Sequence, residues 1–162
     1  MRVLVFDLCP LFADGLVHVL KQLEGFEVAA VTDKVESIPA LVADHGVNLV
    51  ILDLDAGQPA VRALELVKSA SPGVRCLMTI THGSQPSLMA AIRMQGDGFL
   101  SKRLKASDFA NQLPRVAAGE MVISDALTSA LAETLRNVSY VDEGRDISVL
   151  SPREMQVLQC IS

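Results

Sequence analysis

The sequence predicts an α/β fold in which a parallel β-sheet is covered by helices on both faces. Three observations support this prediction. Short apolar runs alternate with stretches whose apolar residues recur at helical spacing. Glycine and proline residues separate the two kinds of segment. The apolar runs are nearly continuous, as expected for strands that are buried on both faces of a parallel sheet.

Five apolar runs are predicted to be strands, because they are short and rich in Val, Leu and Phe. They cover residues 2–7, 26–32, 47–53, 74–80 and 98–102. An amphipathic stretch that predicts a helix follows each run, at residues 11–23, 35–44, 59–70, 86–95 and 106–118. Gly96 and Gly119 stand where helix C-caps are expected. Because five such units are too few for a closed eight-stranded barrel, we expect an open, flavodoxin-like sheet with the order 2-1-3-4-5.

Composition and charge exclude several classes of protein. No apolar stretch approaches the ~18 residues of a membrane span, so we expect a cytoplasmic protein without membrane contact. The net charge is −5, and residues 119–162 carry 7 acids against 3 arginines. A surface that binds duplex DNA needs clustered positive charge, which these residues do not supply. Cys9, Cys76 and Cys160 are too few and too scattered for a disulfide framework or a zinc site, and we expect them to be buried.

The apolar runs end in polar residues. The first ends in Asp7, the third in Asp53, the fourth in Thr79 and the fifth in Lys102. In an open parallel sheet, chemistry gathers outside the carboxyl ends of the strands, so these four side chains are expected to meet in one crevice. The alternative is structural, because an Asp after a strand is often a loop former or helix N-cap and a Lys there is usually solvated.

Two carboxylates, a hydroxyl and an ammonium suit the transfer of a phosphoryl group to a carboxylate. Asp53 would attack phosphorus and form an acyl phosphate. Asp7 would help to hold Mg²⁺, which neutralises the phosphoryl oxygens. Lys102 would pair with the product's charge, and Thr79 would hydrogen-bond a phosphoryl oxygen. A flavodoxin-like enzyme or nucleotide binder is the competing interpretation, but no P-loop or GxGxxG motif follows the first strand.

Residues 1–119 resemble the receiver domain of two-component response regulators. "VILDLD" surrounds the phosphoacceptor Asp53, "MTIT" carries the switch hydroxyl of Thr79, and "GDGFLSK" leads to Lys102. Phe99 occupies the family's aromatic switch position. The likeness extends into "AAGEMVISDAL", which is typical of NarL/LuxR-type transcription regulators. The resemblance implies a DNA-binding regulator rather than an enzyme, a sensor histidine kinase as partner, and a homodimer formed through the helices at 86–95 and 106–118.

The sequence departs from the family pattern at the metal site. The family has two adjacent acids after the first strand, and the second directly ligates Mg²⁺, whereas here "DLCP" puts Leu8 in that place. A carboxylate ~4 Å from a divalent ion contributes a few kcal/mol at an effective dielectric near 20, so its loss predicts Mg²⁺ binding at least tenfold weaker. Asp55, together with Asp7 and Asp53, completes the expected metal-binding set. "AGQP" at 56–59 also reshapes the loop after Asp53.

These departures favour a second interpretation, a pseudo-receiver. Such a domain keeps the fold as an interaction module but is not switched by phosphorylation, or it is set by another ligand.

The residues after 119 change character. Residues 124–135 predict a helix with a leucine at every fourth position, and residues 136–148 predict a polar linker. In "LSPREMQVLQCIS" at 150–162, Ser151 and Glu154 form a capping box with Pro152 at the first helical position. This string resembles the start of a LuxR-type helix-turn-helix domain. Residues 149–162 are thus expected to begin a truncated domain whose first helix has nothing to pack against, and DNA binding is expected of the full-length protein only.

Overall fold

The computed structural model describes residues 1–81, 85–141 and 151–161. The strands are β1 (Arg2–Phe6), β2 (Glu27–Thr32), β3 (Leu49–Asp53), β4 (Arg75–Ile80), β5 (Gly98–Ser101) and β6 (Val122–Ile123). The helices are α1 (Pro10–Lys21), α2 (Ile38–Asp44), α3 (Gln58–Ala70), α4 (Gln85–Arg93), α5 (Ala106–Ala118), α6 (Asp125–Val141) and α7 (Pro152–Ile161). Two short 3-10 turns, η1 (Val35–Ser37) and η2 (Leu54–Ala56), precede α2 and α3.

The described strands form one parallel sheet with the order β2-β1-β3-β4-β5-β6. The predicted order of the first five strands is confirmed. The sixth strand was not predicted, because two residues are too few to show a periodic pattern. Ser124 fixes this strand beside β5: its amide donates to the carbonyl of Phe99 at 3.0 Å, and its hydroxyl accepts from the amide of Ser101 at 2.9 Å.

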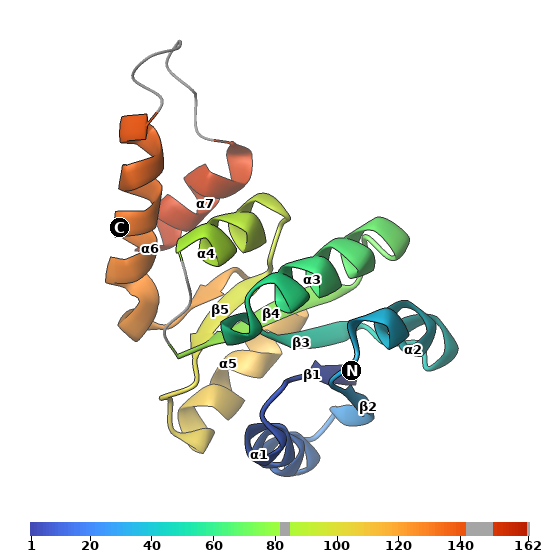
Figure 1. Cartoon of the computed structure of the whole chain (residues 1–162). Coiled ribbons are helices and arrows are strands. Elements are labelled where there is room, and N and C mark those ends of the chain that lie inside the picture. Colours follow the sequence, from blue (N-terminus) through green and yellow to red (C-terminus); the bar gives the residue numbers. More distant parts are fainter. Residues whose placement is uncertain (82–84, 142–150, 162) are drawn as a thin grey trace.

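The sheet has one helical layer on each face (Figure 1), α1 and α5 on one side and α2, α3 and α4 on the other. Residues 3–6 of β1 and 49–52 of β3 are fully buried, which explains why these strands are apolar without alternation. Among the described residues, no helix is both long and apolar enough to cross a membrane. Cys76 is buried as expected, whereas Cys9 and Cys160 are exposed, which corrects the prediction for those two residues.

Helix α6 is longer than predicted. The expected helix at 124–135 continues to Val141, so the prediction of a polar linker is wrong for residues 136–141. This segment, "RNVSYV", mixes polar and apolar residues and has no glycine or proline to end a helix. The rest of the predicted linker, at 142–150, lies outside the described residues.

Helix α7 packs against α4 and α6, so the expectation that it has nothing to pack against is wrong. Val157 is fully buried in this contact. The predicted capping box is confirmed: the Ser151 amide donates to the Glu154 carboxylate at 2.7 Å, and the Glu154 amide donates to the Ser151 hydroxyl at 3.3 Å. Glu154 also pairs with Arg93 of α4, N–O 3.3 Å. Burial would raise the pKa of the Glu154 carboxyl, but its hydrogen bonds from Ser151 and Arg93 lower it overall.

Replacing each of two glycines with alanine is expected to change the free energy of unfolding in opposite directions. Gly119 ends α5 in the left-handed region at φ 97°, whereas Gly15 lies inside α1, where an added Cβ would meet nothing within 4 Å. We expect Gly119→Ala to lower the free energy of unfolding by about 1–2 kcal/mol through backbone strain. Gly15→Ala should raise it by about 0.5–1 kcal/mol through helix propensity. Urea denaturation of both variants measures the difference, and equal effects would contradict the assignment of the two backbone conformations.

Candidate functional site

The four predicted strand-end residues come from adjacent strands at the same edge of the sheet. Asp7 follows β1, Asp53 ends β3, Thr79 lies near the end of β4, and Lys102 follows β5. Asp53 and Thr79 are direct neighbours in the β3–β4 register. The order of the strands therefore brings together residues that are far apart in the chain.

Lys102 is the centre of a buried ion cluster. Its Nζ lies 2.6 Å from Asp53 Oδ1, 3.2 Å from Asp7 Oδ2 and 3.8 Å from Asp55 Oδ2. The Lys102 side chain is 10 % exposed, and those of Asp7 and Asp53 are 1 % and 6 % exposed. One ammonium thus faces two buried carboxylates and a third, that of Asp55, which is 26 % exposed. Asp7, Asp53 and Lys102 thus lie close together, as their positions after the apolar runs predict.

Backbone amides hold the three carboxylates in place. The Cys9 amide donates to Asp7 Oδ1 at 2.7 Å, and the Asp55 amide donates to Asp53 Oδ1 at 3.0 Å, where Asp53 caps the η2 turn. The Thr81 amide donates to Asp55 Oδ2 at 2.7 Å. These three hydrogen bonds fix the orientation of the carboxylates around Lys102.

Burial and ion pairing together determine the pKa values of Asp7 and Lys102. It raises the pKa of the Asp7 carboxyl, and the negative charge of Asp53 adds to this rise, although the Cys9 amide and Lys102 oppose it. Burial alone would lower the pKa of the Lys102 ammonium. Its hydrogen bonds and charge attraction to Asp53 and Asp7 outweigh that effect and raise the pKa overall. Lys102 therefore stays charged at neutral pH and compensates its acidic neighbours.

The two predicted switch residues, Thr79 and Phe99, take no part in the ion pairs of the cluster. Thr79 is fully buried, and its hydroxyl donates to the carbonyl of Leu52 at 3.4 Å. Phe99 is also fully buried and belongs to the core beneath α4, paired with Met78 in the β4–β5 register. The structure thus brings Asp7, Asp53, Asp55 and Lys102 together, with Thr79 beside Asp53 and Phe99 further inside.

The three carboxylates supply oxygen donors of the kind that Mg²⁺ prefers. Asp7 Oδ2 is buried and makes no hydrogen bond of good geometry, although Lys102 Nζ lies 3.2 Å away, so its contact is an ion pair. Across the described part of the chain, no three His, Cys, Asp or Glu residues are arranged to hold a metal ion. The Lys102 ammonium, which contacts all three carboxylates, would compete with a Mg²⁺ ion held by them.

Two further residues lie beside the cluster, and of these only Leu8 was singled out from the sequence. Phe12 of α1 places its ring centroid 4.6 Å from Lys102 Nζ, a cation–π contact. In the sequence Phe12 is only one apolar residue in the first turn of a helix. Leu8, at the position of the missing acid, is 48 % exposed and lies between Asp7 and Cys9, whose amide binds Asp7. An acid at this position would face solvent at the edge of the cluster.

The chain is similar to bacterial response regulators along nearly its whole length. It is 30% identical to the virulence-factor transcription regulator BvgA of Bordetella pertussis over 164 residues, covering 99% of this chain and 76% of BvgA. It is 28% identical to the nitrate/nitrite response regulator NarL of Escherichia coli over 161 residues, covering 99% and 74%. No family model matches the sequence.

Solved structures share the fold at low sequence identity. A LuxR-family two-component response regulator from an Aurantimonas species has a TM-score of 0.73 at 18% identity, with 85% of this chain and 97% of that one covered. The isolated receiver domain of RcsB from Salmonella enterica, solved with a phosphomimetic, has a TM-score of 0.70 at 16% identity, with 80% and 96% covered.

Proposed function

The chain belongs to the NarL/LuxR-type response regulators, which are DNA-binding regulators of transcription, and we propose from this that phosphorylation of Asp53 in residues 1–119 controls dimerisation and DNA binding. The observation that supports the role of Asp53 most directly is its 2.6 Å contact with Lys102 Nζ. We propose that a sensor histidine kinase is the source of the phosphoryl group. We also propose that DNA is bound by a helix-turn-helix domain that begins at residues 149–162.

The proposed chemistry follows from the cluster. As the carboxylate of Asp53 bonds to phosphorus, the bond from phosphorus to the donor's leaving group breaks, and an acyl phosphate results. Lys102 would then move from the carboxylates to the new phosphoryl oxygens, and the Thr79 hydroxyl would turn from the Leu52 carbonyl toward them. Such a change shifts a two-state equilibrium only as far as the phosphoryl group binds one state better.

Dimerisation belongs to the same proposal. The family analogy suggests the face from α4 to α5 as the dimer surface. In the structure α6 and α7 both pack on α4, so part of that face is already covered.

Beryllofluoride with Mg²⁺ tests the phosphoacceptor. We expect a Mg²⁺-dependent adduct on the wild-type chain that the Asp53→Asn variant does not form, because the nucleophilic carboxylate is gone. The exposed Asp14→Asn change on α1 should leave adduct formation unchanged and serves as the matched control. Fluorine NMR or mass spectrometry of the complex measures the outcome. An adduct that persists in Asp53→Asn would exclude Asp53 as the acceptor.

A second test restores the missing acid. We propose that Mg²⁺ binds this chain weakly, because Leu8 stands in place of a direct ligand and Lys102 occupies the carboxylates. Leu8→Asp should raise the Mg²⁺ affinity at least tenfold, since a carboxylate near a divalent ion contributes a few kcal/mol. Leu11→Asp, an equally large change at a residue 83 % exposed on α1, should not. Calorimetric titration separates the two, and equal gains would mean that general charge, not ligation, is responsible.

The pseudo-receiver is the second candidate, and one observation favours it. The Lys102 ammonium lies within 3.8 Å of an oxygen from each of three carboxylates, so the cluster is already neutralised in part without a metal ion. If no beryllofluoride adduct forms at millimolar Mg²⁺, this candidate replaces the first. The domain would then work as an interaction module in the same transcription regulator.

A further inference from the structure

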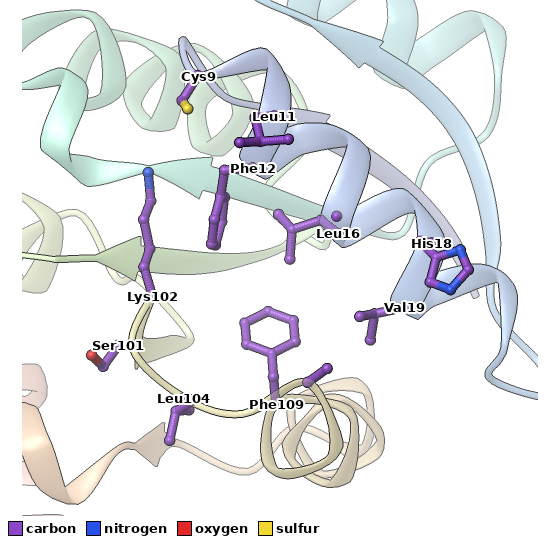
Figure 2. Close-up of a pocket in the computed structure, with 12 residues that line it drawn as sticks. Cys9, Leu11, Phe12, Leu16, His18, Val19, Ser101, Lys102, Leu104 and Phe109 are labelled. Atoms are coloured by element: carbon purple, nitrogen blue, oxygen red, sulfur yellow. The ribbon is translucent and has the colours of Figure 1, made fainter.

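A cavity of about 560 Å³ opens between α1 and α5, and its wall includes Lys102 of the ion cluster but none of the three carboxylates (Figure 2). Its wall is mainly apolar, formed by Leu11, Phe12, Leu16, Val19, Leu104 and Phe109. This volume lies within the range of pockets that enclose a drug-sized ligand, ~300–1,000 Å³, and such pockets are mostly apolar with a few polar groups. Leu11 at this wall is 83 % exposed, so a ligand that covers it removes apolar surface from water.

The polar residues of the cavity indicate a neutral ligand. Lys102 is already paired with three carboxylates. The Nε2 atom of His18 lies 2.8 Å from the side-chain Nε2 atom of Gln22, and the Ser101 hydroxyl accepts a hydrogen bond from the backbone amide of Arg103 at 3.2 Å. Because these groups have partners within the chain, a charged ligand would gain no free counter-charge here and would lose its hydration.

The aromatic residues indicate the shape of the ligand. In Figure 2 the rings of Phe12 and Phe109 face the space between the two helices, one from α1 and one from α5. Flat rings stack favourably in offset or edge-to-face arrangements, so two rings in the wall favour a planar aromatic ligand over an aliphatic one. Phe12 also contacts Lys102. A molecule that packs against Phe12 therefore touches a residue in direct contact with the centre of the ion cluster.

We propose that the cavity between α1 and α5 binds a neutral, largely hydrocarbon, aromatic small molecule, and that this ligand acts on Lys102 through Phe12. The inference does not depend on phosphorylation of Asp53, because the cavity contains none of the three carboxylates. The ligand would be a second chemical signal for this regulator, distinct from a phosphoryl group.

Gly15 gives a clean variant for the test. It lines the cavity on α1, and a Cβ there would meet nothing within 4 Å, so Gly15→Phe adds a bulky side chain at the cavity wall without a clash at the Cβ. Gly73→Phe is the matched control, since Gly73 lies in an exposed turn away from the cavity and its Cβ would also meet nothing. The probe is Nile red, a neutral polyaromatic dye whose fluorescence rises in apolar surroundings. Thermal unfolding verifies that both variants fold.

We expect saturable one-to-one binding of Nile red to the wild-type chain and to Gly73→Phe, and at least tenfold weaker binding to Gly15→Phe. Adding the dye should shift the amide NMR signals of Phe12 and Lys102. Absence of saturable binding, or equal binding to all three proteins, overturns the proposal. Light scattering adds a further outcome. If the wild type is a dimer that Gly15→Phe dissociates without dye, a second copy fills the cavity and the small-molecule proposal is wrong.

Discussion

Replacing Lys102 with methionine is expected to lower the free energy of unfolding by about 3–5 kcal/mol, the cost of removing one partner from a buried ion pair. The ammonium is the charge that compensates Asp7 and Asp53, whose side chains are at most 6 % exposed. Methionine keeps most of the volume of the side chain, so the loss reports on charge rather than on packing. Chemical denaturation at neutral pH measures it.

The loss should depend on pH with a defined sign. Burial raises the pKa of the Asp7 carboxyl, so the folded chain takes up this proton at a higher pH than the unfolded chain. A charged, buried Asp7 lowers the free energy of unfolding. This effect is absent below the ordinary pKa of an Asp and grows as the pH rises through the raised pKa of Asp7. Lys102→Met should accordingly cost least in acid and most at neutral pH.

Lys105→Met is the control for the Lys102 variant, because Lys105 is exposed just before α5 and should change stability by less than ~0.5 kcal/mol. A double variant, Lys102→Met with Asp7→Asn, should recover part of the loss by removing one uncompensated charge. If Lys102→Met is as stable as the wild type at neutral pH, the ammonium does not compensate the carboxylates.

The second large effect is expected at Asp97, the residue before β5. Its Oδ2 accepts hydrogen bonds from Lys68 Nζ and from the Cys76 amide, both at 2.7 Å, and its Oδ1 lies 3.8 Å from Arg153 Nη2 of α7. Asp97→Ala should lower the free energy of unfolding by about 2–3 kcal/mol, because hydrogen bonds to a charged group are lost and donors are left unpaired.

The same variant should loosen α7. Burial lowers the pKa of the Arg153 guanidinium, and the charge of Asp97 opposes that effect, so without Asp97 the half-buried cation loses its nearest carboxylate. Hydrogen exchange of the Val157 amide should then speed up more than that of amides in β3. Asp108→Ala, at an exposed position of α5, should change neither quantity. Unchanged exchange at Val157 would show that apolar contacts alone hold α7.

The proximity of the strand-end residues could be predicted from the sequence because of one physical rule. In a parallel sheet the carboxyl ends of neighbouring strands share an edge, so Asp7, Asp53 and Lys102 could be placed together from their positions after apolar runs. The contact of Phe12 with Lys102 could not be predicted, because it depends on the rotation of α1 about its own axis.

The tail was harder to predict for a different reason. The capping box of α7 is local and was readable in the sequence, whereas its packing on α4 depends on Arg93, some sixty residues earlier. The end of α6 was misplaced because polar composition alone does not stop a helix. Local sequence signals thus predicted the helices of the tail, whereas their contacts with residues distant in the sequence could not be predicted.

The stoichiometry of the ion cluster has an electrostatic consequence. Counted with the formal charges of their residue types, the three Asp residues and Lys102 sum to −3 + 1 = −2 at the rim of the sheet. Small anionic phosphate esters must approach this rim against a repulsive field, which dissolved salt screens over about 10 Å at 0.1 M. Encounter with such anions is therefore slowest in dilute buffer, the reverse of enzymes that steer charged substrates inward.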